Sequence, residues 1–309
     1  MEARDSSRAV ELAYDLVERV QARARFAGTG AVTPLGEAYV AGERGGLPLI
    51  APARGAQVLS LAAERQLYVV GSSVRNGEAP YLAEPVRSTI DEALEIASAL
   101  NHGPLAPAIA GGWAALESLL NEGRDPEERK VMAAIRAAAL VTCSWPRAEF
   151  TALSYRIRED PGDDLPQRLA ACGSNRERAV LVAAELEKRD ALPIVRSWRT
   201  ANDLAAVFRM HELLSDRRAV LNRVHWCMEV SFRRLYRCRN IVLHGGSTGG
   251  VALDATLRVT APLVGAALDR LVHAHLVTGV APLTLAARAE TALRMIGDEV
   301  GRDLCDLIE

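Results

Sequence analysis

The chain of 309 residues has little lysine, few cysteines and no long apolar segment. Lysine occurs only at positions 130 and 188, so arginine carries almost all of the positive charge. The five cysteines are scattered, with no C-x-x-C pair, which argues against a disulfide framework or a thiolate zinc site; we expect reduced, buried packing residues. No stretch approaches the roughly 20 apolar residues that a membrane span needs, and the N-terminus has no apolar signal region. The sequence therefore predicts a cytoplasmic protein.

Positive charge is concentrated in one part of the chain. The formal net charge is −2, so contact with a polyanion has to come from a local patch. Between residues 216 and 239 seven arginines stand against two acids. Arginine presents a planar fork that suits phosphate oxygens. Arg233, Arg234 and Arg237, near the end of this basic patch, are our candidates for binding such an anion.

The composition of the sequence and its pattern of apolar residues change at about residue 85. Residues 5–23 repeat apolar side chains near the helical period, which predicts an amphipathic helix. From residue 28 to residue 85, glycine and proline separate short apolar runs, which is typical of a few strands joined by turns. We therefore expect a small α+β segment over 1–85. From residue 86 to residue 309 the pattern is helical almost throughout and predicts a helical bundle, so the fold class is mainly α.

Caps and breakers divide this bundle into predicted helices. Thr89 and Glu92 form a capping box, and Asp125 with Pro126 starts a second helix. Ser215 or Asp216 is expected to cap the longest helix. The predicted helices span 89 to the NHGP stop at 101–104, 111–123, 125–143, 146–157, 175–189, 202–214, 216–243, 253–277 with a kink at Pro262, and 284–307. In the longest one a seam recurs every seven residues and is expected to be buried: Leu221, Met228, Leu235 and Val242.

The longest helix ends on YRCRNIVLHGG, from Tyr236 to Gly246, and its polar residues lie off the buried seam. At about 100° per residue, Tyr236, Asn240 and His244 follow one face of the helix. Arg239 stands roughly 140° from His244, so only its long side chain or fraying of the helix end would bring the two together. A purely structural interpretation also fits, with His244 bound to the last carbonyls and the other polar groups paired with neighbouring helices.

The stretch RNIVLH, residues 239–244, resembles the R-x(4–6)-H motif of HEPN domains. These are helical bundles of RNA-cleaving toxins, CRISPR effectors and anti-phage proteins, often with a polar residue directly after the arginine. GWAALESLL, residues 112–120, resembles the W-x-x-L-E helix of some of them. The resemblance covers about 86–309, leaves the helices near 146–214 as an insertion, and says nothing about 1–85. Two other Arg/His pairs, at 218/225 and 270/275, fit the spacing without the Asn, the aliphatic triplet and the Gly pair.

The resemblance implies a metal-independent endoribonuclease, either a toxin or a phage-defence effector. In such enzymes the 2′-hydroxyl of the RNA attacks the adjacent phosphorus and leaves a 2′,3′-cyclic phosphate. His244 would move protons, Arg239 would stabilise charge on the phosphoryl oxygens, and Asn240 would hold the phosphate or the catalytic groups in register. Supporting roles fall to Tyr236 and Glu117, and RNA binding to Arg233, Arg234 and Arg237.

The resemblance also implies a homodimer in which two motifs form one composite cleft, with neither a cofactor nor a metal. A free ribonuclease would poison its host, so we expect an inhibitory or activating protein partner, or restraint by the 1–85 segment. Two alternatives stay open. One is a non-catalytic HEPN-like module that binds RNA, a nucleotide or a partner protein, and the other is a helical scaffold that assembles through 1–85.

Overall fold

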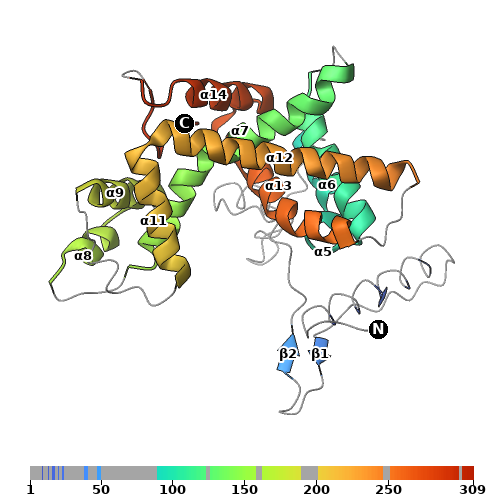
Figure 1. Cartoon of the computed structure of the whole chain (residues 1–309), viewed down its shortest axis with the longest axis horizontal. Coiled ribbons are helices and arrows are strands. Elements are labelled where there is room, and N and C mark those ends of the chain that lie inside the picture. The colour runs from blue at the N-terminus through green and yellow to red at the C-terminus, as the bar shows by residue number, and fades with distance from the viewer. Residues whose placement is uncertain are drawn as a thin grey trace, which may run out of the picture. The chain divides into compact units, whose positions relative to one another are not determined.

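The computed structural model describes residues 89–122, 126–157, 162–188, 201–245, 251–298 and 301–309, with two short strands and a few helical positions before residue 24. The described part is mainly helical (Figure 1). This confirms the predicted class, a mainly α chain that forms a helical bundle.

Before residue 89, the described structure includes a short antiparallel strand pair. Strand β1 (Ala38–Val40) pairs with β2 (Leu47–Leu49), and Ala38 lies opposite Leu49. Strand β2 falls in one of the apolar runs that the sequence predicts as strands. Leu16 and Val20 are helical, as predicted, and their side chains are exposed. The other apolar runs and the predicted boundary at residue 85 lie outside the described residues.

The chain forms two compact units. The described helices of the first lie within Glu84–Ser118 and Arg234–Gly265, and those of the second within Leu119–Arg233 and Ala266–Glu309. Three continuous helices contribute to both units: α6 (Leu105–Leu120), α12 (Arg217–Leu243) and α13 (Val251–Thr278).

In the first unit, a glycine pair lets α6 pack closely against the helices before it, α4 (Thr89–Ala97) and α5 (Ala99–His102). A Cβ at Gly111 would lie 2.2 Å from the carbonyl oxygen of Ile96, and one at Gly112 would lie 2.7 Å from a methyl of Leu100. The prediction that this helix begins at 111 is therefore wrong. It begins at Leu105, because the glycines serve a helix contact and not a helix start.

In the second unit, α7 (Pro126–Ser154) is the helix against which the others pack. Helices α9 (Asn175–Lys188), α11 (Ala201–Ser215) and α14 (Pro282–Arg294) each contact α7 (Figure 1). Close approach is possible because α7 buries small side chains. Those without any exposed surface include Ala133, Ala134, Ala137, Ala138 and Ala139.

Three helix boundaries of the second unit differ from the prediction. The helices predicted at 125–143 and 146–157 are one helix with Pro146 inside it, because a proline removes a single backbone donor and the flanking turns remain packed. The predicted loop before 175 contains α8 (Leu165–Ala170). Helix α14 ends at Arg294 and not near 307, and Gly297 follows in a left-handed turn with φ of 82°.

Helix α12 begins and ends where the sequence predicts. The side chain of Asp216 accepts a hydrogen bond from the backbone N–H of Ala219 at 3.0 Å, which caps the helix. Leu221 and Leu235 of the predicted seam are fully buried, whereas Met228 and Val242 are half-buried. Helix α13 contains Pro262, the predicted kink position.

The cysteines are free, and three of the five are buried. Burial raises the pKa of Cys143 to about 12, and its thiol donates to the carbonyl of Ala289 at 3.4 Å. Cys227 is exposed, so the prediction of burial is wrong at this position, and Cys172 is half-buried.

Candidate active site at the end of helix α12

The three predicted catalytic residues lie at the C-terminal end of α12, within the first unit. The helix ends at Leu243, but the backbone N–H of His244 still donates to the carbonyl of Asn240 at 3.0 Å. Gly245 then turns the chain with φ of 92°, which glycine adopts without strain. His244 is therefore held in helical geometry at the terminus, with its side chain exposed.

Arg239 and Asn240 contact each other directly. The Nη1 of Arg239 donates to the Oδ1 of Asn240 at 3.1 Å, and both residues are half-buried. A guanidinium has five N–H donors in a fixed plane, so this bond orients the group and leaves donors for an anion. In the sequence Arg239 and Asn240 are merely adjacent, whereas in the structure a hydrogen bond joins their side chains.

An aromatic contact links this end of α12 to α6. The rings of Tyr236 and Trp113 lie 5.0 Å apart between centroids, tilted by 48°. The indole N–H of Trp113 donates to the carboxylate of Glu117 at 3.1 Å, one turn further along α6. Trp113 is fully buried. The two predicted supporting residues, Tyr236 and Glu117, are thus joined through Trp113, a link that the i, i+4 spacing of Trp113 and Glu117 partly signals.

Within the described residues, no hydrogen bond or ion pair joins His244 to Arg239 or to the side chain of Asn240. The backbone of His244 is hydrogen-bonded as in a helix, so ideal helical geometry, with Arg239 and His244 roughly 140° apart, applies at this end. One chain therefore places the imidazole and the guanidinium on different sides of α12.

The arginines of the basic patch fall into two groups. Ion pairs join Arg217 to Glu187, Arg218 to Asp298, Arg223 to Glu212 and Arg233 to Glu229. In contrast, Arg234 and Arg237 are exposed and have no acidic partner among the residues that the structure describes. Of the three predicted RNA-binding arginines, Arg233 is thus already neutralised. Of these three, Arg234 and Arg237 are the two whose charge no described acid offsets.

The arginines of the other two Arg/His pairs have structural partners. Arg218 donates to the carbonyl of Ile296 at 3.0 Å and to Asp298 at 2.8 Å. Arg270 binds the carboxylate of Asp269, whose side chain is buried. These contacts account for the two arginines without any catalytic role.

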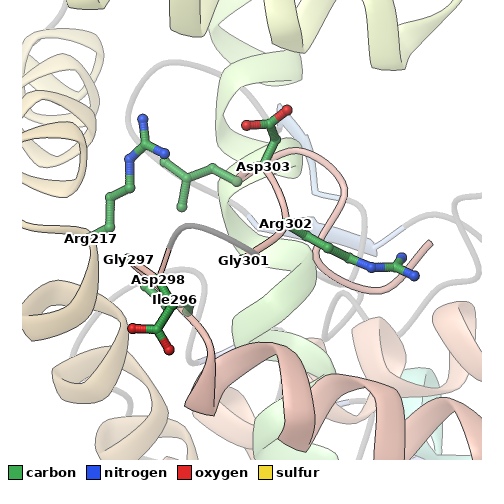
Figure 2. A pocket seen from close by; sticks show the side chains of 8 residues that line it. Arg217, Ile296, Gly297, Asp298, Gly301, Arg302 and Asp303 are labelled. Atoms are coloured by element: carbon green, nitrogen blue, oxygen red, sulfur yellow. The ribbon is translucent and has the colours of Figure 1, made fainter.

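A small cavity of about 220 Å³ lies in the second unit and contains none of the predicted site residues. Figure 2 shows that the charged side chains around it do not converge on one point. Two of them are already in ion pairs, Arg217 with Glu187 and Asp298 with Arg218. The lining residues are Arg217, Ile296, Gly297, Asp298, Gly301, Arg302, Asp303 and Leu304.

Among the described residues, no group of three or more His, Cys, Asp or Glu side chains is placed to hold a metal ion. None of the helices that the structure describes is long and apolar enough to cross a membrane. No protein-family model, no curated protein and no solved structure matches this chain.

Proposed function

We propose that this protein is a metal-independent endoribonuclease of HEPN type, with Arg239, Asn240 and His244 as its catalytic residues. The observation that supports this most directly is the hydrogen bond between Arg239 and Asn240, one turn before an exposed histidine at a helix terminus. The bond preorganises an anion-binding group, and the exposed imidazole is within reach of a substrate. We further propose that the enzyme acts as a toxin or phage-defence effector held in check by a partner.

The reaction requires proton transfer and charge stabilisation only. The 2′-oxygen of the RNA attacks the adjacent phosphorus while a base takes its proton, and the bond from phosphorus to the 5′-oxygen breaks as an acid protonates that oxygen. The products are a 2′,3′-cyclic phosphate and a 5′-hydroxyl. His244 serves in these proton transfers, and Arg239 stabilises the negative charge on the non-bridging oxygens. DNA lacks the 2′-hydroxyl and is not a substrate.

The separation of Arg239 and His244 on one helix supports a dimeric site. A two-fold homodimer would set the end of one α12 beside the other, so that the imidazole of one copy faces the guanidinium of its partner. The contact between Trp113 and Tyr236 would then keep each helix end rigid. In this arrangement a monomer is inactive.

A second candidate function is a non-catalytic module that binds RNA, a nucleotide or a partner protein. The same separation favours it, because a single chain does not bring the imidazole to the guanidinium, whereas Arg234 and Arg237 lack an acidic partner in the described part of the chain and can bind an anion. In that case the Arg239–Asn240 pair contributes to binding alone.

Cleavage of a labelled structured RNA in the presence of EDTA tests the nuclease. Arg239→Ala and His244→Ala should each lose roughly 10²- to 10⁴-fold in rate, because each removes a group that acts in the transition state. His275→Ala, which removes a half-buried histidine on α13, is the control and should cleave normally. Wild-type product should end in a cyclic phosphate.

Light scattering on the same samples tests the dimer. Cleavage unaffected by His244→Ala would refute the site, and RNA binding by wild type without cleavage would favour the binding module. A fully active monomer would refute the composite cleft but leave the catalytic residues in place.

A further inference from the structure

We propose that one outward face of α12 binds single-stranded RNA, with Trp226 as a base-stacking platform and Arg234 and Arg237 as phosphate contacts. The identification of the nucleic acid as RNA rests on the proposed ribonuclease function. The face leads along the helix to His244, so it would guide the strand to the site of cleavage.

Six exposed residues of the continuous helix α12 make up this face: Trp226, Val230, Arg234, Arg237, Ile241 and His244. At about 100° per residue, these six positions fall within an arc of about 80° around the helix axis. Trp226 and His244 are five full turns apart, so they project from the same side, about 27 Å from each other along the axis.

Trp226 is largely exposed, in contrast to Trp113, the buried tryptophan that contacts Tyr236. Its exposed fraction is 64%, whereas that of Trp113 is 0%. Val230 and Ile241 on the same face are 36% and 49% exposed. Single exposed apolar side chains are common, but an aromatic and two aliphatics aligned on one helix face offer a flat surface on which bases can stack.

The charge on this face indicates which class of molecule can bind to it. Between residues 226 and 244 the one acid in the sequence is Glu229, and it is bonded to Arg233 at 2.7 Å. Arg234 and Arg237, about two and three turns further along the same helix than Trp226, have no acidic partner among the described residues and therefore add positive charge to this face. A polyanion with flat apolar groups matches this combination, and a nucleic acid is such a molecule. A second copy seated along the whole face would set arginine against arginine.

The exposed Trp226 also predicts whether the RNA bound here is single-stranded or double-stranded. In an A-form duplex the bases are stacked on each other, and the deep, narrow major groove does not admit side chains. A single strand can turn its bases out onto Trp226 while its phosphates reach the arginines. We therefore expect a preference for single-stranded over double-stranded RNA.

Fluorescence anisotropy with a labelled single-stranded 2′-O-methyl RNA 12-mer tests the proposal, since this probe has no free 2′-hydroxyl and cannot be cleaved. Trp226→Ala should bind roughly 5- to 150-fold more weakly, and Trp226→Phe should retain most of the affinity. Phe208→Ala is the matched control, because Phe208 on α11 has the same exposed fraction of 64% and should leave binding unchanged. Arg234→Ala/Arg237→Ala should lower the slope of log affinity against log salt by about 1.4, or about 0.7 for each phosphate contact.

The proposal is overturned if Trp226→Ala binds as wild type does, or if wild type binds duplex and single strand equally. It is also overturned if Trp226→Ala changes the mass in solution and not the RNA affinity, which would assign the face to a contact between copies. These outcomes separate it from the nuclease. Cleavage that needs His244 but not Trp226 defeats this inference alone, and Trp226-dependent binding without cleavage defeats only the nuclease.

Discussion

The two ends of α12 carry similar numbers of arginines and use them differently. At the N-terminal end Arg217, Arg218 and Arg223 are held in ion pairs with acids of other helices or turns. At the C-terminal end Arg234 and Arg237 are exposed without an acidic partner among the described residues, and Arg239 is bonded to an amide. Among the described residues, arginine charge without an acidic partner lies at the C-terminal end of α12.

A count of arginines in one stretch of sequence therefore overstates the charge available for binding. Exposed ion pairs contribute about 0–1 kcal/mol to stability, so the paired arginines add little to the fold, yet their positive charge is offset by the partner carboxylate. The bond to an amide oxygen leaves the charge of Arg239 uncompensated. Whether an arginine of α12 can bind a ligand therefore depends on whether an acid already pairs with it, and not on how many arginines the helix has.

The largest expected effect comes from removing the aromatic link at the C-terminal end. Trp113→Ala should lower the free energy of unfolding by about 3–5 kcal/mol, because it opens a cavity beside Tyr236 and Glu117. Trp226→Ala should change it by less than about 0.5 kcal/mol, because that side chain is exposed. Urea denaturation of both variants checks this, and equal losses would contradict the different burial of the two tryptophans.

A close helix contact should give the next largest effect. Gly111→Ala is expected to cost about 1–3 kcal/mol, since its Cβ would collide with the backbone oxygen of Ile96. Gly112→Ala should cost less, because it meets a methyl of Leu100 that can move aside, and alanine itself favours the helix by about 1 kcal/mol. Thermal unfolding of the two variants measures the difference. The reverse order would mean that α6 packs through Gly112.

The paired arginines provide the most direct test of the comparison. Arg223→Ala/Arg233→Ala should change the salt dependence of RNA binding by less than half of the roughly 1.4 expected for Arg234→Ala/Arg237→Ala. The reason is that the first pair is already bonded to Glu212 and Glu229. Anisotropy titrations at several salt concentrations give both slopes. Equal slopes would show that ion pairing does not remove an arginine of α12 from the RNA surface.

The smallest effect extends the comparison to an ion pair outside α12. Arg176 bonds Asp306 and holds the pKa of that carboxyl below its usual range. The stability this gives is present above the usual carboxyl pKa and is lost as pH falls through the lowered folded value. Asp306→Asn should remove that part of the acid sensitivity, less than about 1 kcal/mol.

Denaturation midpoints between neutral pH and about pH 3 measure the effect. Asp303→Asn is the control, because Asp303 is exposed three residues away. A larger change for Asp303→Asn would show that the bond to Arg176 does not set the acid response.

Local signals predicted much of the fold. The ranges of α9, α11 and α12 agree with the prediction to within two residues, and the Asp216 cap is present. The errors arise at glycines and a proline that usually mark the end of a helix but here lie inside one, because of how the helices pack. The glycines of α6 serve a contact with Ile96 and Leu100, and Pro146 stays inside α7 because the surrounding helix is packed.

The candidate site divides in the same way. Helical periodicity predicts that Tyr236, Asn240 and His244 share a face and that Arg239 does not. It does not predict which arginines are neutralised, since Arg217 and Arg218 pair with acids 30 and 80 residues away. The contact of Tyr236 with Trp113 joins α12 to a helix more than a hundred positions earlier, and only folding brings them together.

Local sequence is enough to predict that this protein is mainly helical, that α12 runs from an aspartate cap to a glycine turn, and that Arg239, Asn240 and His244 end it. These properties depend on neighbours within a turn or two, which the order of residues specifies directly. Folding sets which arginines lack an acidic partner in the described part of the chain, and which tryptophan is buried and which is exposed. Those properties depend on side chains far apart in the chain, whose positions are set by packing and not by local propensity.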